Sequence, residues 1–329
     1  MVAARPSASP ARQKPSASVD LKAFGDKLAK SGFDVIQPFD VRWYNNYVKA
    51  EGLPLKPLPT FGLKSGAVGI LIGNSRAIWP AFLSWLGQQQ DPLNMSDPLD
   101  TFIATIIKPA VATLAGKDVK YDVIWPWEGG SRLCSMQRVA ICSALCYHDS
   151  ETQLAIHPRF GSWVAFRAVV VLHAEPSAHG LAGTAPKPLS CLMSEAEKSA
   201  ARAAMQAALR ASDEANLCTQ LHGAKGMERD VRLAWAALRD CVRVGSQHRY
   251  TDEQLTYHYT KDKAVLEKAL RAHGARRWRV ALSWLVSLAE VVLTFALPLL
   301  VIVLAVWTSG KRGLPGKPGQ DSLIHPLAR

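Results

Sequence analysis

The sequence predicts an α+β domain followed by a single membrane-spanning helix near the C-terminus. Two apolar runs, 67–73 and 161–172, contain many β-branched or aromatic residues and are typical of buried strands. The stretches around them have helical periodicity, but strands and helices do not alternate as they do in a doubly wound sheet. A third run, 291–309, contains no charged residue. With 329 residues, 48% of them hydrophobic, the chain can bury a sizeable core in one domain or two.

Local patterns predict the elements of the N-terminal half. A helix is expected at 20–31, and a compact segment, F-D-V-I-Q-P-F-D-V-R-W-Y-N-N-Y-V, follows at 33–48. After the strand at 67–73, Asn74 or Ser75 offers a cap for a helix at 77–90. The remaining elements of this half are a helix from Asp97-Pro98-Leu99-Asp100 to about Leu114, a strand at 119–125 and a helix at 134–147.

The C-terminal half is expected to be mainly helical after the strand at 161–172. A connection rich in proline, glycine and alanine occupies 174–190. The sequence Ser194-Glu195-Ala196-Glu197 is a capping box, and it begins an alanine-rich helix that ends near residue 211. Two further helices are expected at 228–242 and 251–272.

Residues 1–19 are expected to form a disordered basic tail. They are rich in alanine, serine and proline, and the first acidic residue is Asp20. A mitochondrial transit peptide would share this character, but Pro6, Pro10 and Pro15 would interrupt the amphipathic helix that it needs.

The segment 280–309 is expected to be a transmembrane tail anchor, followed by a short basic tail at 310–329. Its apolar part is long enough to span a bilayer, and Trp284 and Trp307 lie near its ends, where interfacial aromatic residues occur. The alternative is a buried core helix, which rarely lacks a polar stripe over this length. An anchor would leave the domain facing the cytosol, on the mitochondrial outer membrane or the endoplasmic reticulum; the alternative location is cytoplasmic.

The net charge of +12 is compatible with nucleic acid, an anionic membrane surface or acidic ligands. No nucleic-acid-binding signature is present, so a nucleic-acid partner is not expected. The six cysteines contain no C-x-x-C pair and no zinc spacing, and no metal site is expected. His157, which precedes Pro158, is either a ligand or a structural turn residue, and the structural role is preferred.

Arg167 lies within the apolar strand at 161–172. Strict alternation would place it on the strand face of Trp163, Val169 and Val171. A buried guanidinium is costly unless it is paired. Arg167 is therefore expected to meet an anion, which is either an internal carboxylate or a ligand.

The stretch H-P-R-F-G-S-W-V-A-F-R at 157–167 resembles the signature of the CblC-type cobalamin-processing proteins, the methylmalonic aciduria and homocystinuria type C family. Matching motifs occur in the same order along the chain, including F-D-V-R-W-Y-N at 39–45, D-P-L-D at 97–100 and R-Y-T-D-E-Q at 249–254. The resemblance covers roughly residues 30–270, and 200–230 looks like a helical insertion relative to the family. The signature residues are His157, Pro158, Arg159, Phe160, Gly161 and Trp163.

The resemblance implies a flavin reductase/nitroreductase-like fold and an enzyme that processes cobalamin inside the cell. Such an enzyme binds cobalamin base-off and removes its upper axial ligand. It is both a cyanocobalamin reductase, with electrons from reduced FMN or FAD and possibly NADPH, and a glutathione-dependent alkylcobalamin dealkylase. The thiolate comes from glutathione, so no protein residue is assigned as catalytic. Expected partners are a CblD-type adaptor and the methionine synthase system.

The resemblance also implies site residues. Arg167 and Arg239 align with arginines that contact glutathione; the third such arginine falls near Val265, where Lys263 is the nearest cation. The residues expected to bind cobalamin are Lys120, Cys134, Ser135, Met136, Gln137, Tyr147, His148, Ala155 and Phe166.

Two other functions remain open. The chain departs from the family pattern at Ala155, Ile141 and Val265, which favours a non-catalytic, membrane-tethered carrier or chaperone of cobalamin. A flavin-dependent reductase of another substrate could use the same fold.

Overall fold

The computed structural model of the chain describes residues 19–181, 183–222, 228–275 and 287. Met1–His273 form one compact unit and Gly274–Arg329 a second. The predicted N-terminal tail, tail anchor and basic C-terminal tail lie outside the described residues, except for Val19 and Ser287. The predicted insertion at 200–230 is described except for residues 223–227.

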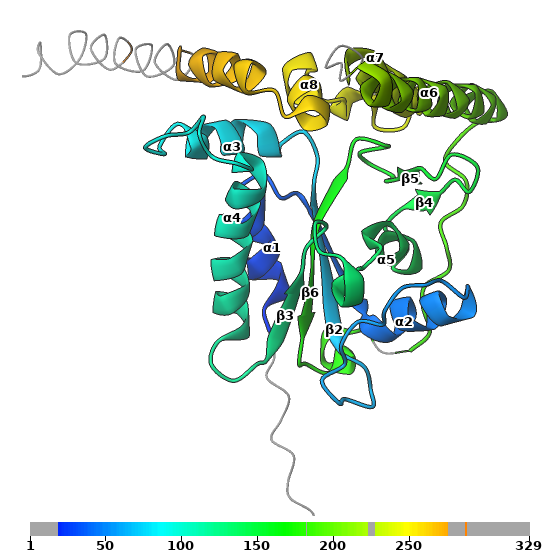
Figure 1. Cartoon of the computed structure of the whole chain (residues 1–329). Helices are drawn as coiled ribbons and strands as arrows, with labels where there is room; N and C mark the ends of the chain where they lie inside the picture. The colour runs from blue at the N-terminus through cyan, green and yellow to red at the C-terminus, as the bar shows by residue number, and fades with distance from the viewer. Residues whose placement is uncertain (1–18, 182, 223–227, 276–286, 288–329) are drawn as a thin grey trace, which may run out of the picture. The chain divides into compact units, whose positions relative to one another are not determined.

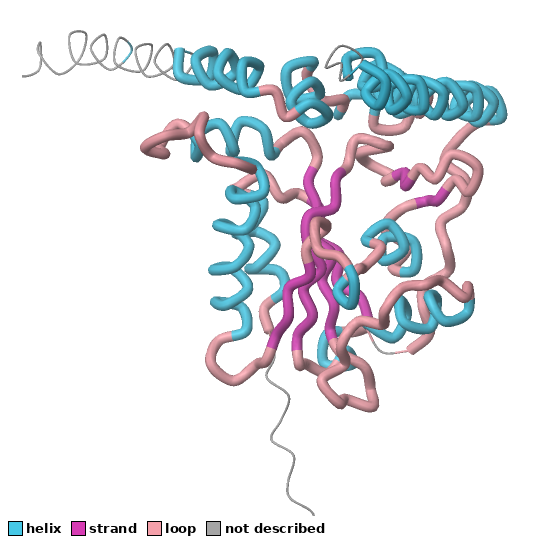
Figure 2. Tube along the Cα trace, viewed as in Figure 1, coloured by secondary structure: helices cyan, strands magenta, loops and turns pink. Residues whose placement is uncertain are grey.

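A four-stranded antiparallel sheet forms the centre of the first unit (Figure 2). In spatial order its strands are β1 (Val35–Asp40), β2 (Val68–Asn74), β6 (Ala165–Leu172) and β3 (Tyr121–Ile124). From residue 167 to residue 172, β6 is buried, and its neighbours pair along both edges. The prediction that both faces of this strand are covered is confirmed.

Helices cover both faces of the sheet (Figure 1). On one face lie α1 (Leu21–Ala29), α3 (Ile78–Leu86) and α4 (Pro98–Ala115); on the other lie α2 (Val41–Ala50) and α5 (Met136–Cys142). Val170 packs toward the first group and Val169 toward the second, as alternation along a strand requires. Among the described residues, α4 is long and apolar enough to cross a membrane, but its buried side chains belong to the first core cluster. The α+β class is therefore confirmed.

The C-terminal part of the unit is a helical layer with a small second sheet. The strands β4 (Tyr147–His148) and β5 (Ala155–Ile156) pair with each other. Two long helices, α6 (Glu195–His222) and α7 (Glu228–Asp240), lie side by side (Figure 1). The last named helix is α8 (Asp252–Thr260), and the short 3-10 helices are η1 (Gly130–Arg132), η2 (Pro176–His179) and η3 (Ser246–His248).

Two predicted helices are shorter than expected because the backbone turns left-handed. The predicted helix at 134–147 ends as α5 at Cys142, and Ala144 has φ 53°. Its last predicted residue, Tyr147, belongs to β4 instead. The predicted helix at 251–272 breaks at Lys261, where φ is 54°, and helical structure resumes at residue 263.

The expected cap at Asn74 or Ser75 is found only in part: the Ser75 Oγ accepts from the Ala77 N–H at 3.2 Å, whereas Asn74 does not cap the helix. The residue before α3 is Ala77, which makes no side-chain cap hydrogen bond. Asn74 is instead the last residue of β2. Ser75 donates to the carboxylate of Asp34 through both its backbone N–H and its hydroxyl. Asn74 is thus available to β6, where it meets Arg167. The alanine-rich helix α6 continues beyond the predicted end at residue 211 because no helix-breaking residue interrupts its sequence.

Candidate functional site

The signature begins with a tight turn from His157 to Gly161. The N–H of His157 donates to the Gly161 carbonyl (2.9 Å), and the N–H of Gly161 donates to the His157 carbonyl (2.8 Å). The His157 Nδ1 accepts from the backbone N–H groups of Arg159 (3.0 Å) and Phe160 (3.2 Å). Burial lowers the pKa of His157 to about 4, so the ring stays neutral and keeps this acceptor. The geometry supports the structural role that the sequence favoured.

Gly161 allows the turn to dock directly on the segment after α7. Its φ is +58°, and a Cβ there would lie 1.8 Å from the Val244 carbonyl oxygen. The neighbouring Gly245 is equally close to the backbone of Phe160. Close backbone contact therefore fixes the connection between α7 and α8 to the beginning of β6.

Arg239, at the C-terminal end of α7, lies over the signature tryptophan, Trp163. Its Nε and Nη2 donate to the Ser162 carbonyl at 3.0 and 2.6 Å. The guanidinium is 4.2 Å from the ring centroid of Trp163 and 5.0 Å from that of Tyr250. Aromatic faces hold cations by electrostatic attraction. The signature thus positions Arg239 without using a carboxylate.

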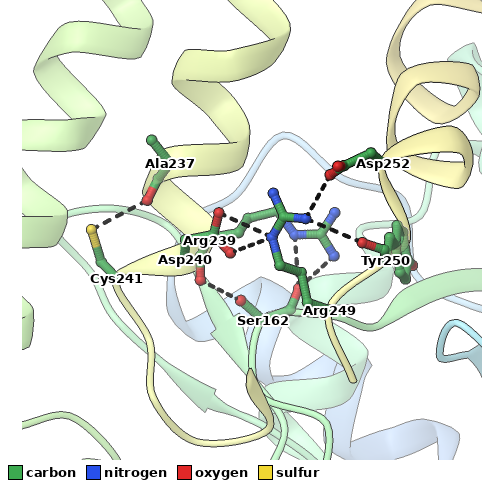
Figure 3. A network of polar contacts seen from close by, with 8 residues as sticks. All are labelled: Ser162, Ala237, Arg239, Asp240, Cys241, Arg249, Tyr250 and Asp252. Atoms are coloured by element: carbon green, nitrogen blue, oxygen red, sulfur yellow. Dashed lines mark hydrogen bonds and ion pairs between the residues drawn. The ribbon is translucent and has the colours of Figure 1, made fainter. Parts of the chain in front are cut away.

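Arg249, next to Arg239, is bound differently. Its Nε lies 2.9 Å from Asp240 and its Nη1 lies 3.0 Å from Asp252 (Figure 3). Arg239 forms no ion pair with any residue that the structure describes. Of these two neighbouring arginines, only Arg249 has its charge compensated internally.

Arg167 lies at a bulge in β6. Ile72 pairs with Ala168 and Gly73 with Phe166, so Arg167 is the extra residue opposite no partner. Phe166 packs on the face of Val169, and Arg167 turns to the opposite face. The expectation from strict alternation is therefore wrong, because the bulge shifts the register by one residue.

Arg167 is 8% exposed, and its Nε donates to the Asn74 Oδ1 at 2.6 Å. Within the described part of the chain no carboxylate lies within ion-pair distance of it, so the internal Asp or Glu partner considered from the sequence is not found there. Burial lowers the pKa of Arg167, although a guanidinium remains charged at neutral pH. The guanidinium thus makes no ion pair with a described residue, although the charge of Asp100 acts on it from a distance.

His258 lies among the cations of this region. Burial lowers its pKa to about 3, and the positive charges of Arg167, Arg239 and Lys261 add to the effect. His258 is therefore neutral at physiological pH. The Arg239 guanidinium lies 5.0 Å from the Tyr250 ring, which lies 5.8 Å from the His258 ring, and the charge of Arg167 acts on both Arg239 and His258. We call this region the cationic site: Arg167, Arg239, Tyr250, His258 and Lys261.

A pocket of about 410 Å³ opens beside Arg239. It contains three of the residues expected to bind cobalamin: Gln137, Ala155 and Phe166. Phe166 lines the pocket, and Arg167, the next residue of β6, is not among the lining residues. No group of three or more His, Cys, Asp or Glu residues in the described ranges could hold a metal ion.

No family profile matches the sequence. The cyanocobalamin reductase / alkylcobalamin dealkylase of Danio rerio is 24% identical over 191 residues, which are 53% of this chain and 73% of that protein. The crystal structure of the Caenorhabditis elegans B12-trafficking protein CblC, a human MMACHC homologue, superposes with a TM-score of 0.50. That match has 17% identity and covers 77% of this chain and 95% of the other. The chain is thus similar in sequence to a cyanocobalamin reductase / alkylcobalamin dealkylase and shares the fold of the CblC structure.

The other residues that were expected to bind cobalamin divide into three groups. Cys134, Ser135 and Met136 begin α5, where burial raises the pKa of the Cys134 thiol to about 11. Tyr147 and His148 form β4, in which His148 pairs directly with Ala155. Lys120 is exposed and its carbonyl accepts from His173, at the opposite end of β6 from Phe166. Sequence order alone did not reveal this separation.

Lys263 is exposed at the beginning of the helical stretch 263–273, and no described contact joins it to either arginine. Lys261, two residues earlier, is the lysine whose charge acts on His258. Val265 packs against the core. Sequence reasoning missed five residues of this region: Asn74, Tyr250, Gln254, His258 and Lys261. The R-Y-T-D-E-Q motif at 249–254 was a signal for Tyr250 and Gln254.

Proposed function

We propose that the chain processes cobalamin. It binds cobalamin base-off, with the dimethylbenzimidazole base lifted from cobalt, and removes the upper axial ligand before the cobalamin passes to downstream enzymes. The activity named for the zebrafish relative supports this proposal. The observation that carries it is that Arg239, which has no ion pair with a described carboxylate, lines the pocket that contains Gln137, Ala155 and Phe166, and that Arg167 follows Phe166 in β6.

In the proposed dealkylation, glutathione occupies the cationic site. Glutathione has two carboxylates, and a guanidinium binds a carboxylate through two parallel hydrogen bonds. Arg167 and Arg239 would hold the tripeptide with its sulfur directed at the corrin, which is catalysis by proximity. The thiolate attacks the cobalt-bound carbon, a carbon–sulfur bond forms, and the carbon–cobalt bond breaks. The electron pair stays on cobalt, which leaves as cob(I)alamin beside the thioether.

In the proposed decyanation, cobalt gains an electron and cyanide leaves. Reduced FMN or FAD, itself reduced by NADPH, would supply that electron when bound. The contribution of the chain is to hold the corrin and to exclude solvent from the cobalt ligand.

The pocket fits part of a cobalamin. Its volume of about 410 Å³ is within the range of roughly 300–1,000 Å³ typical of small-molecule sites. A whole cobalamin is larger, so one edge of it would enter the pocket and the remainder would lie over the opening. Aromatic and aliphatic side chains line most of the pocket, including Trp235, Leu238 and Tyr259, which suits an apolar corrin edge.

A non-catalytic carrier is the second candidate. Val265 replaces a cation in the family pattern and packs against the core, so it offers glutathione no charge. A carrier would bind cobalamin without thiol-dependent dealkylation. A flavin-dependent reductase of another substrate would not bind cobalamin.

We also propose that the segment 280–309 anchors the chain in the mitochondrial outer membrane or the endoplasmic reticulum, with the domain facing the cytosol. Delivery would then involve a CblD-type adaptor and the methionine synthase system. Fractionation of cells that express the full chain, beside a variant lacking 280–329, tests the anchor: the full chain should sediment with membranes and the variant should not.

A visible-light titration of methylcobalamin tests the function. The full-length chain in detergent is mixed with methylcobalamin in the dark and without oxygen, first alone and then with glutathione. A blue shift to the base-off spectrum, followed by formation of cob(I)alamin, supports the enzyme. A base-off shift with no reaction supports the carrier, and no shift supports the reductase of another substrate.

A further inference from the structure

Two buried polar atoms beside the cationic site have no hydrogen-bond partner among the described residues. They are the Tyr250 hydroxyl and the Gln254 Oε1. Tyr250 is 2% exposed and Gln254 is 5% exposed. Buried polar atoms in folded proteins are almost always paired, so each exception requires an explanation. Two exceptions on neighbouring elements indicate a common missing partner.

Tyr250 borders both arginines. Its ring lies 5.4 Å from that of Trp163 and 5.0 Å from the Arg239 guanidinium. Tyr250 also acts on Arg167, whose pKa it raises. The unpaired hydroxyl is therefore at the place where a carboxylate held by these arginines would bind.

Gln254 reaches the same site from α8. It lies in the first turn of that helix, and His258 lies one turn later on the same face. The His258 ring is 5.8 Å from the Tyr250 ring and is influenced by Arg167 and Arg239. Gln254 and His258 thus form one helix face toward the cationic site.

The two unpaired atoms differ in chemistry. A tyrosine hydroxyl can donate to a carboxylate, but the Gln254 Oε1 can only accept and so requires an N–H or O–H donor. The positive charges of Arg167, Arg239 and Lys261 disfavour an ammonium group at this place. A neutral amide N–H satisfies the acceptor without that repulsion.

We infer that Tyr250 and Gln254 are ligand-binding residues of the cationic site. Tyr250 donates a hydrogen bond to a carboxylate that the arginines hold, and Gln254 accepts a hydrogen bond from an amide N–H of the same molecule. The site therefore selects a peptide thiol over a simple thiol acid. This inference rests on the proposed function and specifies how the thiol is recognised.

Calorimetric titration of the full-length chain in detergent tests the inference with two probes. Glutathione has carboxylates and amide N–H groups, whereas 3-mercaptopropionate has a carboxylate and no N–H group. Gln254→Leu should weaken glutathione binding about three- to tenfold, the effect of one lost hydrogen bond, and leave 3-mercaptopropionate binding within about twofold. Tyr250→Phe should weaken both probes by about three- to tenfold.

Stability separates a binding role from a structural one. Each variant removes an unpaired buried atom, so the melting temperature of the ligand-free chain should be unchanged or higher. The matched controls are Gln88→Leu and Tyr121→Phe, which change exposed residues and should bind both probes like the wild type.

Three results would overturn the inference. Equal weakening of both probes by Gln254→Leu, together with a lower melting temperature, would assign Gln254 a structural role. Wild-type binding by both variants, while Arg167→Gln abolishes it, would reject the inference and leave the proposed function intact. A wild-type chain that binds no glutathione would reject both.

Discussion

The two ends of strand β6 differ in how completely their polar groups are satisfied. At the Leu172 end the ladder is regular on both edges, and Val169, Val170 and Val171 are fully buried among apolar side chains. At the Ala165 end the ladder contains a bulge that turns the buried Arg167 out of register. Apolar packing stabilises the Leu172 end, whereas at the Ala165 end the buried Arg167 makes no ion pair with a described residue. A bulge and a buried charge at one place in an otherwise regular sheet indicate a candidate functional site, because such departures from regular packing are expected where function requires them.

The largest expected effect is at the turn that precedes the bulged end. Gly161→Ala places a Cβ against the Val244 carbonyl and forces a positive φ on alanine. The free energy of unfolding should fall by about 3 kcal/mol or more. Gly116→Ala is the matched control, since Gly116 also has positive φ but no atom within 4 Å of a Cβ. It should cost about 1 kcal/mol, and equal costs in chemical denaturation would contradict the docking role of Gly161.

The same turn should make stability depend on pH. The folded-state pKa of His157, about 4, lies below the ordinary value of 6.5. The neutral His157 ring therefore contributes its full share of the free energy of unfolding above pH 6.5. This contribution is lost as the pH falls from 6.5 to 4, by at most about 3 kcal/mol. His157→Asn keeps an acceptor for the turn but cannot be protonated in this range. Denaturation between pH 4 and 7 should show a shallower pH slope for this variant, and an unchanged slope would refute the assignment.

Arg167→Gln should separate ligand binding from stability. Losing a charge-assisted contact should weaken glutathione binding about ten- to a hundredfold, while cobalamin affinity stays unchanged. The free energy of unfolding should change by less than about 1 kcal/mol, because the lost guanidinium had no described ion pair. Titrations of both ligands and denaturation measure these effects; equal losses for both ligands would indicate a structural arginine.

The matched change at the other end of the strand is Val170→Thr. It buries a hydroxyl where no described partner is present, and should cost about 1–3 kcal/mol of unfolding free energy without changing glutathione affinity. If both ends respond alike in denaturation, the contrast between them does not hold.

The smallest expected effects distinguish two lysines. Lys261→Asn keeps a residue that tolerates the left-handed backbone and removes a charge near His258. It should weaken glutathione binding about twofold, in keeping with a screened charge at the edge of the site. Lys263→Gln should change that affinity by less, since Lys263 is exposed and has no described contact with the arginines. A larger effect of Lys263→Gln in calorimetry would restore the sequence-based assignment.

Local sequence patterns determined much of the fold. The two apolar runs predicted β2 and β6, and the capping box predicted the beginning of α6, because such signals depend on neighbours a few residues apart. The signature motif predicted the similarity to the CblC-type proteins. Arg167 within an apolar strand also predicted a site for an anion, since burial of a charge requires compensation wherever the strand lies.

Tertiary structure decided which residues share the site. The bulge opposite Gly73 turned Arg167 away from Phe166, and no periodic pattern in the sequence predicts one extra residue in a strand. Arg239 and Tyr250 reach Trp163 because the turn at Gly161 docks on a segment about 80 residues later. Lys120, predicted to bind cobalamin, lies next to His173, at the other end of β6 from Phe166. Contacts over such separations depend on how the layers pack, and the sequence encodes that packing only through the whole chain.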